Sequence, residues 1–490
     1  MPVYDLAIIG GGSAGLTAAR VAVALGARVA LVERSPASLG GDCLHTGCVP
    51  SKALIHAARA HWEAGRTARW GLPTREATAA VDLGAVLAGV REVQGAAGMV
   101  DTPEALGALG IALVYGDARF RSPALLEVAE RPLHARRYLI ATGSRPAIPP
   151  IAGLDTVPYL TNETLFALTA LPSSLLVVGG GPVGCELGQA LARLGAGVTI
   201  VTRATRLLPK DDAAASATLR RAFETEGIAV ITGARVEQLT RADGAIVAQV
   251  RQDETVREHR ATTLLVAAGR QIDTASLDLA AAGVVTTARG IAVDEHARTA
   301  NPRIYAAGDV IGQRFFTHVA GYQASVAVAN ALLPARMRLD YHTIPWTTFT
   351  SPEVARIGFN EDEARAHGHK ATSTRFDYRE NDRALTARAA AGNYLTLVHD
   401  ARGTILGAQI VGPSAGETIN EVAIAMKHRL SLAQFSAASH AYPTLGMGLQ
   451  QAALAWRAES RLARGGRVFL RPIFRWQRRR LARELAAHGD

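Results

Sequence analysis

Residues 6–33 read LAIIGGGSAGLTAARVAVALGARVALVE: an apolar run, a glycine-rich turn, an alanine-rich stretch and a second apolar run that ends at Glu33. A strand, glycines, a helix, a strand and a terminal acid within about 30 residues are typical of a dinucleotide-binding unit. Gly10, Gly12 and Gly15 let the backbone approach a pyrophosphate at the helix N-terminus, and Glu33 is placed to accept a hydrogen bond from a ribose hydroxyl. The sequence therefore predicts a Rossmann-like parallel sheet at the start of the chain.

A second unit of the same kind begins at residue 175, with the sequence LLVVGGGPVGCE. Its second strand is followed by Arg203 and, three residues later, Arg206, where an acidic residue would favour NAD. Arginine suits a 2′-phosphate, so NADPH is favoured and NADH remains an alternative. Either arginine is alternatively an ordinary solvated charge. The nucleotide-binding glycines predicted here are Gly179, Gly181 and Gly184.

Residues 40–52 read GGDCLHTGCVPSK and contain two of the three cysteines of the chain. In a chain this poor in cysteine, a pair five positions apart favours redox chemistry over structural cross-linking. A regular helix would separate such a pair by about 7.5 Å along its axis, more than the ~4.4–6.8 Å between the Cα atoms of a disulfide. We therefore expect the backbone to deviate between Cys43 and Cys48. Gly47 permits the deviation, and Lys52 favours thiolate over thiol.

The pattern GGDCxxxGCVPSK resembles the active site of the class I pyridine nucleotide-disulfide oxidoreductases, the group of glutathione reductase, dihydrolipoamide dehydrogenase and mercuric reductase. The resemblance extends to about residue 455. It implies that Cys43 attacks the substrate, that Cys48 contacts the flavin and that Glu186 pairs with Lys52 beside the flavin. The first nucleotide unit would then bind FAD. Further FAD contacts are implied at Lys52, Gly143 and Asp309.

The predicted fold class is α/β, with two Rossmann-like dinucleotide-binding domains, for FAD and NAD(P), and a C-terminal α+β dimerisation domain. Gly269 lies in the run that closes the nicotinamide domain. The resemblance also implies a homodimer. The predicted domains are a first part of the FAD domain at 1–150, the NAD(P)H domain at 151–272, a second part of the FAD domain at 273–335, the dimerisation domain at 340–460 and a basic tail at 461–490.

The end of the predicted dimerisation domain departs from the family pattern. Disulfide reductases of the family carry a His-Pro-Thr run followed by a glutamate, whereas this chain has Tyr442 and Met447 at these positions. Tyrosine has a pKa of ~10 against ~6.5 for histidine, so at neutral pH it donates a proton and rarely accepts one. Oxidation of a dithiol is therefore disfavoured, and His440 is interpreted as a structural or surface residue.

These observations predict an FAD enzyme that passes electrons from NADPH, through the flavin and the Cys43–Cys48 disulfide, to a disulfide or another electrophilic acceptor. Tyr442 is the predicted acid, and His440, two residues earlier, would replace it only if the local backbone turned it inward. A mercuric or other metal-ion reductase is the alternative, because tyrosine also occurs in this region of mercuric reductases. Those enzymes bind Hg(II) through a C-terminal vicinal cysteine pair, and no cysteine follows Cys185 here. A further alternative is a membrane-tethered flavoprotein that acts mainly as a partner or sensor. No resident metal site is predicted.

The charge of the chain is concentrated at its C-terminal end. The net charge is +10, and the last 31 residues hold nine arginines against Glu484 and Asp490. The rest is nearly balanced, so nucleic-acid binding is not predicted. No apolar run is long enough to span a bilayer, which favours a cytoplasmic enzyme. The tail suits peripheral docking on the inner face of the membrane, or a solvated or partner-packed segment, because Pro472 is expected to interrupt any single amphipathic helix.

Overall fold

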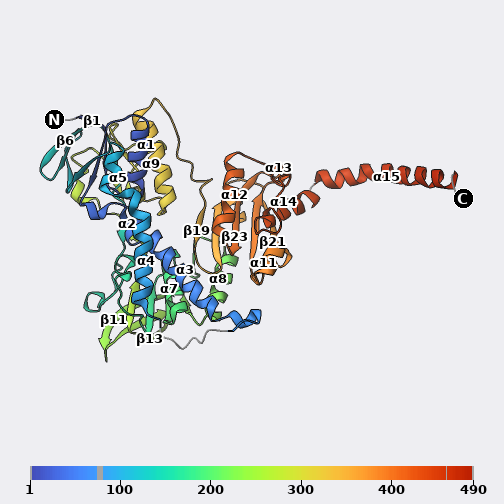
Figure 1. Ribbon diagram of the computed structural model, residues 1–490, viewed down its shortest axis with the longest axis horizontal. Coiled ribbons are helices and arrows are strands. Elements are labelled where there is room, and N and C mark those ends of the chain that lie inside the picture. Colours follow the sequence, from blue (N-terminus) through green and yellow to red (C-terminus); the bar gives the residue numbers. More distant parts are fainter. Residues whose placement is uncertain (1–2, 74–80, 460, 488–490) are drawn as a thin grey trace. The chain divides into compact units, whose positions relative to one another are not determined.

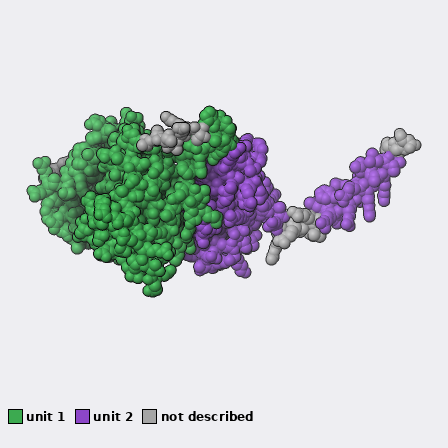
Figure 2. Space-filling view, turned by 90° about the horizontal axis from the view of Figure 1, so that it is seen from below, with its two compact units in different colours: residues 1–209, 220–341 green, residues 210–219, 342–490 purple. Residues whose placement is uncertain are grey.

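The computed structural model describes residues 3–73, 81–459 and 461–487, and the side chains of 461–469 and 487 are not among the described features (Figure 1). The chain forms two compact units, residues 1–209 with 220–341 and residues 210–219 with 342–490 (Figure 2). The sequence placed 210–219 in the NAD(P)H domain, whereas the structure groups this segment with the C-terminal unit, and the boundary at residue 219 falls inside helix α8 (Ala213–Thr225). The predicted domain boundaries stay predictions.

A seven-stranded sheet organises the first part of unit 1. Six strands follow the order β3-β2-β1-β6-β5-β4, and β18 pairs with β6 outside this order. β1 pairs in parallel with β2 and β6, and β18 is parallel to β6, so a segment after residue 300 completes a sheet that begins at residue 3. The strands are β1 (Val3–Ile9), β2 (Val29–Glu33), β3 (Ala112–Tyr115), β4 (Ala118–Ser122), β5 (Leu125–Val128), β6 (Arg131–Ile140) and β18 (Ile304–Ala306).

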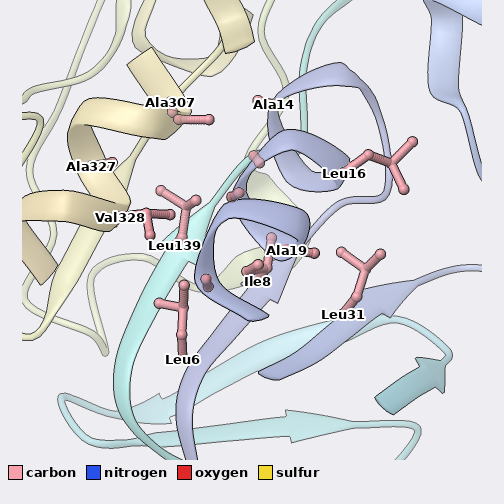
Figure 3. Close-up of a cluster of buried hydrophobic side chains, with 14 of the residues drawn as sticks. Leu6, Ile8, Ala14, Leu16, Ala19, Leu31, Leu139, Ala307, Ala327 and Val328 are labelled. Atoms are coloured by element: carbon pink, nitrogen blue, oxygen red, sulfur yellow. The ribbon is translucent and has the colours of Figure 1, made fainter. Parts of the chain in front are cut away.

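Both faces of this sheet are covered, which explains the continuous apolar run in β1. Leu6 and Ile8 belong to one buried cluster, and Ala7 and Ile9 belong to another on the opposite face. In the first cluster, small side chains let two helices pack closely on the sheet (Figure 3). These helices are α1 (Ser13–Ala24) and α9 (Thr317–Leu332).

The second sheet of unit 1 is parallel, with the strand order β10-β9-β8-β14. Its strands are β8 (Ser174–Val178), β9 (Gly197–Thr202), β10 (Ala229–Thr232) and β14 (Thr263–Val266), and an antiparallel sheet is formed by β11 (Ala234–Ala242), β12 (Ala245–Gln252) and β13 (Thr255–Ala261). The remaining helices are α2 (Gly41–His45), α3 (Cys48–Ala64), α4 (Leu83–Gly98), α5 (Pro103–Ala108), α6 (Asn162–Leu165) and α7 (Pro182–Leu194).

Unit 2 contains a five-stranded antiparallel sheet with the order β19-β20-β23-β22-β21. β19 and β20 are separated by residues 349–352. The strands are β19 (Trp346–Thr348), β20 (Glu353–Gly358), β21 (Thr372–Asp377), β22 (Tyr394–His399) and β23 (Ile405–Gly412), and the helices are α10 (Glu361–Ala366), α11 (Asp382–Thr386), α12 (Ala415–Lys427), α13 (Leu432–Phe435) and α14 (Met447–Glu459).

The last element, α15 (Arg461–Ala487), corrects an expectation drawn from the sequence. Pro472 lies inside this helix and does not interrupt it. Proline has no N–H to donate to the carbonyl four residues earlier. All side chains from Leu470 to Ala486 are exposed. In the part of the chain that the structure describes, no helix is long and apolar enough to cross a membrane.

Candidate active site

The two cysteines of the GGDCLHTGCVPSK stretch lie on either side of a break between two helices. α2 ends at His45, and α3 begins at Cys48 with Gly47 as its N-cap. A Cβ atom on Gly47 would lie 2.7 Å from the carbonyl oxygen of Asp42, so only glycine fits this crossing of the chain. The expected deviation of the backbone between Cys43 and Cys48 is confirmed. Cys48 lies in the first turn of α3, where the helix dipole favours a thiolate.

The electrostatics of the pair favour one negative charge on the two sulfurs. The hydrogen bond from Cys48 is the main cause that lowers the pKa of the Cys43 thiol to about 6. Hydrogen bonds with Thr317 and Ser13 also lower this pKa, whereas burial raises it. The hydrogen bond to Cys43, together with burial, raises the pKa of Cys48. The pair therefore loses one proton readily and resists losing the second. The structure gives the lower pKa to Cys43, whereas the family resemblance places a thiolate on Cys48.

The thiolate character of Cys43 leads to a prediction for the reduced protein. Alkylation of Cys43 by iodoacetamide should be nearly constant above pH 7 and should fall about tenfold per pH unit below the pKa of about 6, because only the thiolate reacts. In Cys48→Ala the main cause of the low pKa is removed, so the midpoint should rise. Mass spectrometry of the peptide that contains Cys43 measures both profiles. An unchanged midpoint in Cys48→Ala would contradict the sulfur–sulfur hydrogen bond.

An ion pair joins α3 to the second nucleotide unit. Lys52 Nζ donates to Glu186 Oε2 at 2.7 Å, and Glu186 is 5% exposed on α7. The sequence resemblance implied this pair across 134 positions, and the structure brings the two residues together. A carboxylate this deeply buried requires a partner, because an uncompensated buried charge is strongly destabilising. Cys185, next to Glu186, is fully buried, as expected for a small core residue.

Each nucleotide unit uses its three glycines in the same way. In the first, a Cβ on Gly15 would lie 1.8 Å from the carbonyl oxygen of Gly10, so α1 packs against the turn without a side chain. A Cβ on Gly12 would have only the Cα of Gly41 near it, at 3.8 Å, so a ligand can approach this residue closely. In the second unit, a Cβ on Gly184 would clash with the carbonyl of Gly179, whereas a Cβ on Gly181 would face open space. These are the roles that bind a pyrophosphate in dinucleotide-binding folds.

Glu33 lies at the end of β2, beside the glycine turn of the first unit. Its Oε2 accepts a hydrogen bond from the amide of Gly11 at 2.6 Å, which holds the carboxylate at the glycine turn. A cavity of about 140 Å³ is lined by Gly10, Glu33 and Thr142, among others. Gly143, the residue after Thr142, has a φ of +71°. Glycines that open a path for a phosphate and an acid at the end of β2 fit the adenosine end of FAD.

A half-buried polar cluster surrounds Asp309, which the sequence resemblance had assigned to the flavin. Ser144 Oγ donates to Asp309 Oδ2 at 2.5 Å, and burial raises the pKa of Asp309. Arg270 lies 3.3 Å from Asp309 and 3.0 Å from Asp42. The sequence analysis had missed Arg270, although it directly follows Gly269, whose φ of +128° marks the turn after β14. The arginine links the cysteine-bearing segment to the segment that contains Asp309.

The arginines of the second unit lie where the sequence predicted them, beyond the end of β9. Both Arg203 and Arg206 are exposed, and Arg206 donates to the carbonyl of Pro209 at 3.1 Å. An exposed guanidinium at this position is accessible to a phosphate.

A cavity of about 340 Å³ lies beside Cys43. Its lining includes Arg20 and Asp101, which form an ion pair at 2.5 Å, and the first two residues of α9, Thr317 and His318. Thr317 also lies 3.3 Å from the sulfur of Cys48. No role for Thr317 itself was predicted from the sequence. The cavity gives an acceptor molecule access to Cys43.

In unit 2, Tyr442 is exposed, and its hydroxyl donates to Asp382 Oδ2 at 2.8 Å. This hydrogen bond raises the pKa of Tyr442, so the phenol stays protonated. Asn381 is buried, and its side-chain amide donates to the carbonyl of Thr444 at 3.1 Å. This hydrogen bond fixes the loop that contains Tyr442. His440 Nε2 lies 2.5 Å from Glu421 Oε1.

Comparisons with known proteins agree with this geometry. The family described as pyridine nucleotide-disulphide oxidoreductase matches residues 4–331, and its dimerisation domain matches residues 344–453. A mercuric reductase of Streptomyces lividans is 37% identical over 457 residues, covering 92% of this chain and 95% of that protein. A dihydrolipoyl dehydrogenase of Thermus scotoductus is 35% identical over 461 residues, covering 92% and 97%. The Cu(II) complex of the HOCl-induced flavoprotein disulfide reductase RclA from Escherichia coli has a TM-score of 0.80 at 26% identity, covering 93% of this chain and 100% of that one.

The chain therefore belongs to the pyridine nucleotide-disulphide oxidoreductase family. Within this family it is a class I, mercuric-reductase-like member, a flavin-dependent oxidoreductase that uses FAD and NAD(P)H and carries a dimerisation domain. The predicted family, fold class, flavin-dependent activity and cofactor classes are confirmed.

Proposed function

We propose that the chain passes electrons from NADPH to an electrophilic acceptor through a disulfide between Cys43 and Cys48. Two electrons and two protons convert this disulfide to the two thiols, and the acceptor then takes the same two electrons. The observation that carries the proposal is the cysteine pair at the break between α2 and α3, with a low pKa at Cys43. Arg203 and Arg206 support NADPH over NADH, because no acidic residue takes their place.

The positions of the two sulfurs support different roles. Cys43 lines the 340 Å³ cavity and holds the more acidic thiol, so it attacks the acceptor. Cys48 lies against Thr317 and feels the charge of Lys52, and it is assigned to the flavin side. The geometry of the first unit supports a set of FAD-binding residues in this proposal. They are Gly10, Gly12, Gly15, Glu33, Lys52, Gly143 and Asp309.

When bound, FAD accepts the hydride of the nicotinamide and supplies the electron pair that reduces the disulfide. The protein contributes a fixed charge at this point. Glu186 is buried and forms an ion pair with Lys52, whose positive charge acts on Cys48. The nicotinamide nucleotide is held by the second unit. Its residues in this proposal are Gly179, Gly181, Gly184, Arg203, Arg206 and Gly269.

The proton donor to the reduced acceptor is Tyr442, within a homodimer formed by the dimerisation domain. The hydrogen bond to Asp382 orients the phenol and keeps it protonated, which suits donation and opposes proton abstraction. The enzyme therefore reduces acceptors and does not efficiently oxidise dithiols.

Reduction of a soft metal ion is the second candidate function. Its support is the 37% identity to a mercuric reductase and the likeness to a flavoprotein disulfide reductase solved with Cu(II). Two adjacent sulfurs that share one thiolate are suitable ligands for a soft ion. No cysteine after Cys185 is available to hand the ion to this pair.

One anaerobic experiment tests the proposal and separates the acceptors. FAD-loaded protein is titrated with NADPH or NADH while the visible spectrum and the free thiols are recorded, and oxidants are then mixed with the two-electron-reduced form. We expect faster reduction by NADPH, two new thiols, and rapid reoxidation by one acceptor class. A low-molecular-weight disulfide and Hg(II) represent the two candidates, with molecular oxygen as the reference oxidant. Reduction of the flavin without new thiols would contradict the redox role of the cysteines.

We also propose that residues 461–490 hold the enzyme in peripheral contact with the inner face of the membrane. The support is the excess of arginine in this tail and the helix α15 that most of it forms. Residues 488–490 lie outside the described part of the chain.

A further inference from the structure

α15 has two chemically distinct faces in its described side chains, residues 470–486. At about 100° per residue, Leu470, Phe474, Leu481 and Leu485 fall within a sector of about 60°. Their exposed fractions are 45%, 49%, 56% and 64%, so in this structure the stripe faces solvent. Single exposed apolar residues are normal on a protein surface, whereas a stripe along a helix indicates an interaction surface.

The other side of α15 is strongly basic. Arg471, Arg475, Arg479 and Arg483 recur every fourth residue and so share one face of the helix. Residues 470–486 contain six arginines and one acidic residue, Glu484, a net charge of +5. Glu484 pairs with Arg480 at 2.8 Å. All the cations are arginine, which binds phosphate oxygens through two parallel hydrogen bonds.

The length and composition of this segment determine how it meets a bilayer. Seventeen helical residues extend for about 25 Å, less than the ~30 Å hydrocarbon core, and the arginines would be costly within that core. A helix that lies in the plane of the surface satisfies both faces at once, because the leucines and Phe474 enter the acyl boundary while the arginines stay among the phosphates. Nucleic acid would bind the arginines and leave the apolar stripe in water.

We propose that α15 is an in-plane anchor for anionic lipid. The leucine and phenylalanine stripe inserts, and the arginine face binds phosphate headgroups. This proposal rests on the peripheral contact proposed above and adds the lipid class, the inserting side chains and the orientation of the helix. It explains why Pro472 is tolerated, since the surface helix does not need to pack against a second helix.

Co-sedimentation with vesicles tests the anchor on the full-length, FAD-loaded protein. Vesicles of phosphatidylcholine alone are compared with vesicles that also contain phosphatidylglycerol. We expect a partition coefficient at least about tenfold higher on the anionic vesicles, reduced by added salt. Phe474→Ser with Leu481→Ser should lose about tenfold or more on the anionic vesicles. The control, Ala482→Ser with Ala486→Ser, introduces the same two serines on the other side of the helix without removing a large apolar side chain, and should bind like the wild type.

A second pair of variants and an activity assay make the outcomes distinguishable. Arg475→Gln with Arg479→Gln should lose the preference for anionic vesicles. NADPH-dependent reduction of a soluble acceptor should be unchanged in all these variants, so failure of catalysis in every protein would refute the enzymatic proposal and not the anchor. Equal binding to both vesicle types would overturn the anchor. Vesicle binding at the wild-type level by the variant with Phe474→Ser and Leu481→Ser would also overturn the anchor. Stronger retention on duplex DNA than on anionic vesicles would assign the tail to nucleic acid.

Discussion

Cys48→Ser is expected to lower NADPH-driven turnover of the acceptor by roughly a thousandfold or more, because residues that act as one redox unit fail together. The variant retains a thiol at Cys43, yet without its partner no internal disulfide forms to carry electrons. Cys43→Ser should lose turnover to the same extent. Steady-state oxidation of NADPH at 340 nm measures both, with the anaerobic FAD content as a check that each protein is loaded.

The two variants differ in the spectrum of their reduced forms. In Cys43→Ser, the hydrogen bond and the negative charge that raise the pKa of Cys48 are lost, while Lys52 still lowers it. Cys48 then becomes the thiolate, and a long-wavelength charge-transfer band should persist, whereas Cys48→Ser should lack it. Cys185→Ala is the matched control: its sulfur is fully buried, and turnover should stay within about twofold of the wild type. A band in Cys48→Ser would reverse the roles of the two sulfurs.

Gly15→Ala is expected to have the second-largest effect, on the folding of the FAD unit. Its new methyl group would lie 1.8 Å from the carbonyl oxygen of Gly10, a contact that neither α1 nor the glycine turn can relieve locally. We expect the free energy of unfolding to fall by about 3 kcal/mol or more, at the upper end of overpacking effects. The purified protein should contain little FAD. Urea unfolding followed by circular dichroism measures the first quantity, and the absorbance at 450 nm measures the second.

Gly12→Ala makes the same chemical change at a site with room for it. The nearest atom to its Cβ would be the Cα of Gly41 at 3.8 Å, and its φ of −84° suits any residue. Its unfolding free energy should remain within about 1 kcal/mol of the wild type, while its affinity for FAD falls because the methyl group occupies the path of the pyrophosphate. Equal stability of Gly15→Ala and Gly12→Ala would refute the assigned packing of α1 on the turn.

The parts of the fold that the sequence predicted are those specified by short-range patterns. The stretch 6–33 has the order and spacing of β1, α1 and β2 built into it. The break at Gly47 followed from covalent geometry alone, since a disulfide does not fit a regular helix at that spacing. Lys52 and Glu186, 134 positions apart, came together only through the family resemblance, because neither residue type nor local spacing identifies a distant partner.

What the sequence missed depends on long-range contacts or on exposure. Arg270 reaches both Asp42 and Asp309, and its role is visible only when three distant segments are placed together. Asp382 became a partner of Tyr442 in the same way. For α15, the expectation that Pro472 interrupts the helix was wrong. A proline removes one backbone hydrogen bond, and the cost of that loss depends on whether water reaches the carbonyl that it frees.

The position of β18 has a consequence for the biosynthesis of the enzyme. The first sheet is left open after β6 ends at Ile140, and it gains its last parallel strand only when Ile304–Ala306 has been made. At 5–20 residues per second, a ribosome takes roughly ten to thirty seconds to make the intervening chain. During that interval one edge of β6 lacks its neighbour while the nicotinamide unit emerges. The nascent chain therefore passes through a stage in which an inserted domain is complete and its host is not, and chaperones that cover strand edges would act at that stage.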